Sequence, residues 1–145
     1  MNKVNRIVLG MCLLVAFSAI PDAWGDGFPC PVPAYLGCGF LYTGGTFSSI
    51  KFPGADLTFA DGINDAGQIV GNYTTAAPGF GSFLYNAGTF STISFPGAGP
   101  NSTLAHGIND AGQIVGSFFQ GGDVHGFVDK AGTFSTIIVP GAGDT

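Results

Sequence analysis

Apolar and polar residues alternate along most of this chain in short runs, and turn residues separate the runs, which is the pattern of β-strands. Between 55 and 97, strands are predicted at about 58–64, 68–74, 82–86 and 89–95. In the last of these strands Phe90 points to one face, whereas Ile93 and Phe95 point to the other. Both faces of the predicted sheets therefore need to be covered by other parts of the molecule.

The turns between these strands carry their own signals. The decapeptide GINDAGQIVG occurs at 62–71 and again at 107–116. Its Asn64 suits the first position of a type I turn, and Gly67 suits the positive φ that a following bulge requires. The same turn chemistry, a type I turn with a bulge, is predicted at 43–45, 86–88 and 129–132.

The repeated decapeptide is interpreted as hairpin architecture, because Ile63 and Ile69 flank a four-residue turn. A ligand loop used twice is the alternative, with Asp65 and Asp110 as calcium ligands at the loop tips. Calcium needs six or more oxygen ligands, and the alternating acids of a calcium loop are missing here.

The strand pattern recurs with a period of about 44 residues, since GTFSSI at 45 is followed by GTFSTI at 88 and at 132. Four short strands per repeat, with both faces covered, favour an all-β fold of antiparallel four-stranded blade-like repeats, a partial β-propeller, over a sandwich. The units are expected at 39–54, 55–97 and 98–142. They make roughly two and a half blades where a ring needs at least about four. The chain is then a piece of a longer product, or copies associate to complete a ring, or the units form an open stack.

The N-terminal segment has a different pattern. Lys3 and Arg6 precede an apolar run at 7–20, which is short for a membrane span, and Ala23-Trp24-Gly25 fits a signal-peptidase site. Residues 1–25 are therefore predicted to be a signal peptide that is cleaved near Gly25, with an uncleaved anchor as the alternative. The product is expected to be secreted by a bacterium and to have no membrane contact after cleavage.

Residues 26–38 form a segment rich in Pro and Cys that precedes the repeat domain at 39–145. Cys30 and Cys38 are the two cysteines that follow the predicted cleavage site, and export favours a disulfide between them. A metal or redox pair is the alternative, but this spacing matches no usual site and no third ligand is near in the sequence.

The charge of the chain argues against some partners. The formal net charge is −5, and Lys51 and Lys130 are the only cations after residue 25. Such a chain has no basic patch that could neutralise phosphates, so nucleic acid and anionic membranes are poor partners.

The supply of catalytic groups is small. A site confined to the last unit could be formed by His106, His125 and Asp123. These residues have no counterparts of the same type one repeat earlier. The glycines recur at turn positions and not in a phosphate-binding loop between a strand and a helix. No catalytic residue, cofactor or metal ligand is predicted.

Candidate ligand contacts are sought where the repeats differ from each other, in predicted loops at 74–81 and 117–124. Tyr73, Phe118 and Phe119 are candidates to stack on sugar rings there, and His125 is a further candidate contact. Ordinary packing between the repeats is the alternative role of these side chains.

The combination of GINDAGQIVG, a Phe-rich strand, GTFSTI and PGA resembles the HAF family of bacterial extracellular repeats over residues 38–142. His125-Gly126-Phe127 keeps the histidine and the phenylalanine of that family's name, whereas Cys38 and Gly81 stand at the histidine position in the earlier units. The resemblance implies a secreted, propeller-like repeat protein without assigned catalytic residues.

We therefore expect a non-catalytic binding or assembly role. Its partners would be a second copy of the chain, a carbohydrate or a surface protein. The alternatives are a fragment of an extracellular propeller enzyme and a lectin-like carbohydrate-binding module.

Overall fold

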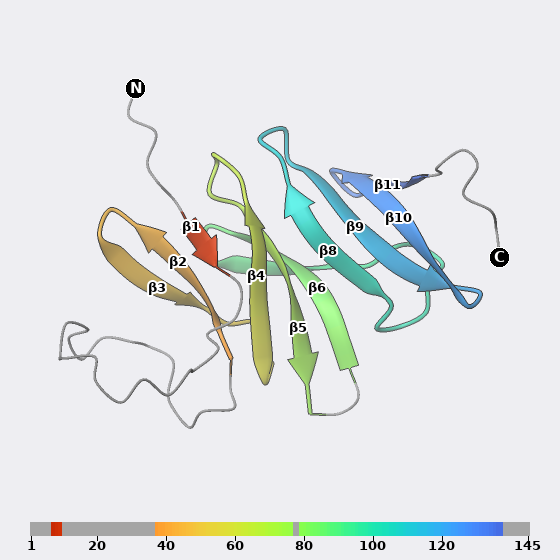
Figure 1. Ribbon diagram of the computed structural model, residues 1–145, viewed down its shortest axis with the longest axis horizontal. Coiled ribbons are helices and arrows are strands. Elements are labelled where there is room, and N and C mark those ends of the chain that lie inside the picture. The colour runs from red at the N-terminus through yellow and green to blue at the C-terminus, as the bar shows by residue number, and fades with distance from the viewer. Residues whose placement is uncertain (1–6, 10–36, 77–78, 138–145) are drawn as a thin grey trace.

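The computed structural model describes residues 7–9, 37–76 and 79–137, and all regular structure in these residues is β (Figure 1). The described part holds no helix and hence none that could cross a membrane. The prediction of an all-β fold is confirmed. The strands are β1 (Ile7–Leu9), β2 (Gly39–Thr43), β3 (Thr46–Ile50), β4 (Leu57–Ile63), β5 (Ile69–Thr75), β6 (Gly79–Asn86), β7 (Thr89–Ile93), β8 (Thr103–Ile108), β9 (Gln113–Gln120), β10 (Asp123–Lys130) and β11 (Thr133–Ile137).

These strands form three antiparallel sheets, which we name A, B and C in chain order. Sheet A has the order β1-β2-β3, sheet B has β4-β5-β6-β7, and sheet C has β8-β9-β10-β11. Sheets B and C are thus the same meander built from consecutive strands, and the four strands predicted between 55 and 97 are confirmed as β4 to β7. Strand β1 pairs with β2 although it lies within the predicted signal peptide, whose cleavage stays a prediction.

The first hairpin of sheets B and C has the predicted turn. The N–H of Gly67 donates to the carbonyl of Asn64 at 2.9 Å, and Gly67 has a φ of 81°. The N–H of Gly112 makes the same bond to Asn109, also at 2.9 Å. The decapeptide is therefore a hairpin in both places, as its turn residues predict.

The last hairpin of each sheet corrects the prediction of a type I turn with a bulge. Ala87 and Gly88 both have positive φ, at 46° and 91°, and they join β6 to β7 as a two-residue loop. Ala131-Gly132 and Gly44-Gly45 do the same. Two successive positive φ values define a type I′ turn, which is favoured because its twist matches the twist of the paired strands.

A repeated connector leads from one sheet to the next. In Phe52-Pro53-Gly54-Ala55 the N–H of Ala55 donates to the carbonyl of Phe52 at 3.1 Å, and Gly54 has a φ of 76°, as a type II turn requires. The connector between sheets B and C forms the same turn. The buried hydroxyl of Thr58 then accepts the N–H of Phe52 at 3.0 Å, which fixes each connector to the first strand of the following sheet.

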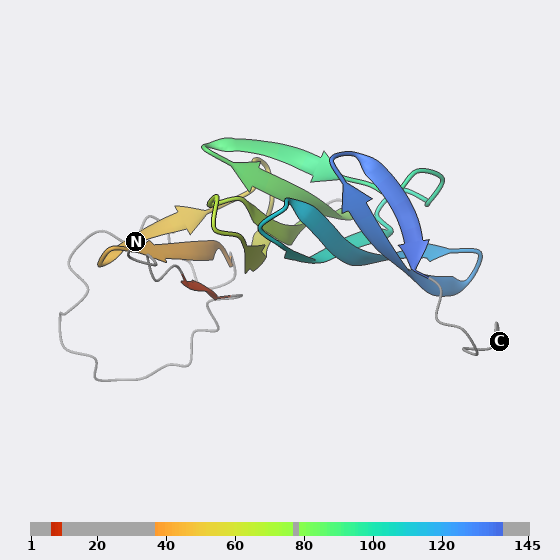
Figure 2. The same ribbon diagram turned by 90° about the horizontal axis from the view of Figure 1, so that it is seen from above.

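The sheets lie side by side along the long axis of the molecule (Figure 2). Two matching apolar clusters fill the spaces between them. Strand β8 packs against β4, β5 and β6 of sheet B. The cluster between sheets A and B contains Ile50, Ala60, Ile69 and Phe83, and the cluster between sheets B and C contains Val70, Ile93, Ala105, Ile114, Phe118 and Phe127.

The decapeptide turns also join sheet B to sheet C. Asn64 is 4% exposed, and its side-chain amide donates to Gln68 Oε1 at 2.8 Å and to the carbonyl of Asn109 at 3.1 Å. The N–H of Asp65 donates to the carboxylate of Asp110 at 2.8 Å. The Asp110 carboxylate therefore holds two neighbouring turns together, which gives it a structural role.

Candidate functional site

Five large apolar side chains are exposed on the described surface: Phe80, Val115, Phe119, Val124 and Ile137. Phe119 and Val124 are a cross-strand pair at the end of the β9–β10 hairpin, and they are 51% and 70% exposed. Exposed apolar groups that gather at one place are a signal of a binding surface. These two residues and Phe80 line one groove, which we call the loop-end groove.

The loop-end groove has a volume of about 760 Å³, which is in the usual range for small-ligand sites. Its walls come from the β9–β10 hairpin, from the start of β6 and from the connector that precedes β8. None of the described residues that line it is an acid, a base or a histidine. The groove therefore combines apolar surface with neutral polar groups.

Hydrogen bonds hold the two sides of this groove in place. The N–H of Phe119 donates to the carbonyl of Ser102 at 2.8 Å, and the Gln120 amide donates to the carbonyl of Gly97 at 2.8 Å. The Ser102 hydroxyl donates to the carbonyl of Gly99. The Phe119 ring is thus presented from a fixed strand next to a connector that is itself fixed.

Two of the predicted sugar contacts have a packing role. The Phe118 ring stacks on Phe95 with a centroid distance of 3.7 Å and is 3% exposed. The Tyr73 ring stacks in the same way on Phe52, at 3.8 Å. These stacks are equivalent in the repeat and lie between each connector and the second strand of the next sheet.

The predicted loops at 74–81 and 117–124 are wrong for most of their length. Residues 117–124 are the ends of β9 and β10, which are joined by the two-residue turn Gly121-Gly122. The β5–β6 hairpin likewise extends into 74–81. The aromatic residues are therefore positioned by strands, and successive strand residues point to opposite faces.

The histidines lie on the strands of sheet C. His125 on β10 has its ring centroid 5.2 Å from that of Phe118. His106 on β8 has Nε2 3.0 Å from the hydroxyl of Ser117. No group of three His, Cys, Asp or Glu side chains in the described residues is placed to hold a metal ion.

The pair of His106 and Ser117 has an equivalent one repeat earlier. There the Asn72 amide donates to the carboxylate of Asp61 at 2.7 Å, across the matching strands and beside the matching bulge. Partial burial raises the pKa of Asp61, while the Asn72 hydrogen bond and the positive charge that His106 can carry act to lower it. A cross-strand polar pair at the bulge is thus a structural feature of the repeat.

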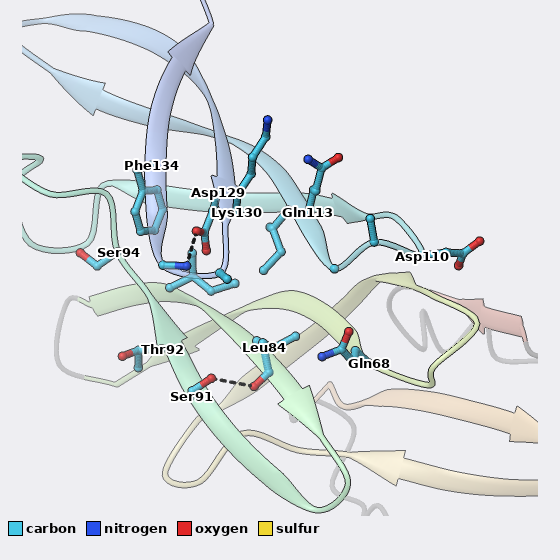
Figure 3. Close-up of a pocket in the computed structure, with 16 residues that line it drawn as sticks. Gln68, Leu84, Ser91, Thr92, Ser94, Asp110, Gln113, Asp129, Lys130 and Phe134 are labelled. Atoms are coloured by element: carbon cyan, nitrogen blue, oxygen red, sulfur yellow. Dashed lines mark hydrogen bonds between the residues drawn. The ribbon is translucent and has the colours of Figure 1, made fainter.

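A second groove of about 790 Å³ lies between β7 and the turns of sheet C (Figure 3). Its charged side chains either bond to turns of the protein or point away from β7. Asp129 accepts the N–H of Gly132 within its own hairpin at 2.7 Å, and Lys130 and Gln113 extend away from β7. This groove is less suited to hold a ligand, because its carboxylates already cap turns.

Cys38 is 6% exposed and directly precedes β2. Cys30, its predicted partner, lies outside the described residues, so the predicted disulfide stays a prediction.

Comparison of the chain with protein-family models, with curated proteins and with solved structures finds no match.

Proposed function

We propose that this protein is a secreted, non-catalytic binding module that holds a neutral polysaccharide in the loop-end groove. The observation that carries the proposal is the Phe119 ring, half exposed on a fixed strand at the edge of a groove with uncharged walls. An aromatic face is flat and apolar, and it matches the C–H face of a sugar ring. The amide of Gln120 and the hydroxyl of Ser102 each donate one hydrogen bond within the protein, and their oxygen atoms can still accept one from a ligand beside the ring.

The charge of the protein supports a neutral ligand. A formal net charge of −5 repels polyanions such as acidic polysaccharides and nucleic acids. Among the described residues, the walls of the groove hold no cation that would offset this repulsion. A neutral glycan carries no such electrostatic cost.

The repeated sheets support a blade-like architecture. Sheets B and C have the same meander, the same bulge and the same connector, as successive blades of a propeller do. The proposal is that the chain forms part of a propeller of the HAF type and reaches the cell exterior through the signal at residues 1–25. Loops and hairpin ends on such a frame can vary without disturbing the stack, which suits them to binding.

The alternative, a fragment of a propeller enzyme, rests on the hydrogen bond between His106 and Ser117. A nucleophilic serine needs an adjacent general base, and a histidine is a common one. However, the equivalent positions hold Asp61 and Asn72, which make the same cross-strand contact without a nucleophile. The repeat therefore favours a structural role for the pair.

The test is calorimetric titration of the full chain, produced in an exporting bacterial host, with cello-, manno- and malto-oligosaccharides. Phe119→Leu keeps an apolar side chain but removes the aromatic face, and we expect it to weaken binding roughly fivefold to tenfold. Phe119→Tyr keeps the face and should bind as the unaltered chain does. The proposal fails if no neutral glycan binds, or if the Leu and Tyr variants bind equally well.

A further inference from the structure

One face of sheet C carries exposed apolar residues, and the equivalent residues of sheet B are buried. In sheet B, Val70 and Ile93 are 0% and 7% exposed. Their equivalents in sheet C, one repeat later, are Val115 and Ile137, which are 44% and 46% exposed. The residue types are the same, so the difference lies in what covers each sheet.

The pairing of strands places these residues on one face. Val115 is paired with Val128 across β9 and β10, and Ile137 is paired with Gly126 across β10 and β11. Since residues 126 and 128 are two apart on one strand, all four positions share a face. Phe119 and Val124 lie on the same side of the sheet at its hairpin end, and we call the part formed by Val115, Gly126, Val128 and Ile137 the open face of sheet C.

The cover on sheet B is the next repeat unit. Ala105 of β8 is 0% exposed and packs in one cluster with Val70 and Ile93. The N–H of Ala105 also donates to the Ser82 hydroxyl at 2.9 Å. The chain itself therefore shows that a face of this kind accepts close apolar cover from a unit of the same type.

Gly126 on the open face is equivalent to Ser82 of sheet B. A glycine at this position still allows a neighbouring sheet to pack closely on the face. In sheet A the equivalent residue is Gly39, where an added Cβ would lie 2.8 Å from the Cβ of Ala60. Sheet A is covered by β4 in spite of having no serine at this position. A glycine therefore lets a neighbouring sheet approach the open face closely.

We propose that a second copy of the chain covers the open face of sheet C, and that the two open faces pack against each other about a two-fold axis. Within the described surface, the large exposed apolar residues belong either to the loop-end groove or to this face. The apolar surface that a second copy offers outside its groove is thus the same face. A patch that contacts itself is isologous and closes as a dimer, and two sheet faces that pack in this way resemble a sandwich.

The dimer leaves the loop-end groove open. Phe80 on sheet B is equivalent to Val124 on sheet C, because the first pairs with Thr74 and the second with Phe119. Phe80 stays 39% exposed although Val70, Ser82 and Ile93 on that face are buried. Cover at the Val115 end therefore does not extend to the groove end, and this inference does not depend on the proposed ligand.

The test is sedimentation velocity of the full chain over a range of concentrations, with Val115→Asp and Val124→Asp compared. Both variants place a carboxylate at an exposed valine on the same side of sheet C, but only Val115 belongs to the open face, whereas Val124 lies at the hairpin end and lines the groove. We expect Val115→Asp to raise the dimer dissociation constant by about tenfold or more, since one charge per copy is buried. Val124→Asp should dimerise normally and lose glycan binding.

Circular dichroism shows whether each variant keeps its β-structure. If Val115→Asp does not fold, Val115→Thr, which has the same shape and one hydroxyl, decides the question by a smaller rise in the dissociation constant. A chain that is monomeric at all concentrations overturns the proposal, as does a dimer that folded variants at Val115 leave unchanged. Glycan binding that survives in Val115→Asp separates the two proposals, because either can then fail alone.

Discussion

The glycine that ends each decapeptide sits in the tightest place of its sheet. A Cβ on Gly71 would lie 1.9 Å from the carbonyl oxygen of Phe59 and 2.9 Å from the ring of Phe83. A Cβ on Gly116 would lie 2.1 Å from the carbonyl oxygen of Leu104 and 2.6 Å from the ring of Phe127. The buried aromatic ring of the third strand thus occupies the space that a side chain on the second strand would need.

We expect Gly71→Ala to lower the free energy of unfolding by about 1–3 kcal/mol, because the backbone carbonyl it meets cannot move aside easily. Gly99→Ala is the matched control, since Gly99 has ordinary φ and no neighbouring atom within 4 Å of an added Cβ. Its effect should stay within about 0.5 kcal/mol. Urea unfolding of both variants measures this, and equal effects would show that the glycine is not needed for space.

At the scale of elements, the asparagine of the first hairpin closes its own turn in both sheets, but only in sheet B does it also bond to the turn of the next sheet. Asn64 closes its own turn by accepting the N–H of Gln68 at 2.9 Å, and it also donates to the next turn. Asn109 closes its turn with the same geometry but is exposed. An identical decapeptide therefore has a different energetic weight in the two sheets.

Asn64→Ala should cost about 1–3 kcal/mol of stability, because the half-buried N–H of Gln68 and the carbonyl of Asn109 both lose their bond to a buried side chain. Asn109→Ala should cost about 1 kcal/mol less than Asn64→Ala, because water replaces the lost bonds at an exposed site. Thermal and urea unfolding of the two variants compare the same change in the same sequence. If the two costs are equal, the contact between the turns contributes nothing measurable to stability.

The hairpins could be predicted because Gly, Asn and Asp mark each turn between alternating runs. The type I′ turns could not, since Ala87 and Ala131 adopt a positive φ that is uncommon for alanine. The roles of Phe118 and Phe119 depend on which face of β9 each occupies, and a single residue of register exchanges them. An alignment of the second and third units does distinguish the two residues: Phe118 aligns with the aromatic Tyr73, whereas Phe119 aligns with Thr74. A position that is aromatic in both units is typical of packing.

At the scale of the whole molecule, the two proposals combine into a bivalent binder. Each copy has one loop-end groove at the β9–β10 turn, and the open face that we propose as the dimer contact lies further along the same sheet. A dimer would therefore present two grooves on one rigid frame. Two grooves can bind one long glycan at once, and the second contact then forms at a high effective concentration.

Avidity gives this combination a measurable consequence. The unaltered chain should bind an immobilised neutral polysaccharide at least about tenfold more tightly than it binds the matching short oligosaccharide, whereas Val115→Asp should bind both about equally. The difference arises because a monomer has one groove, and the variant leaves that groove intact. Biolayer interferometry on the immobilised polymer, with the oligosaccharide as competitor, measures both affinities. A variant that keeps the full gain on the polymer would show that the gain comes from a longer site on one copy and not from two grooves.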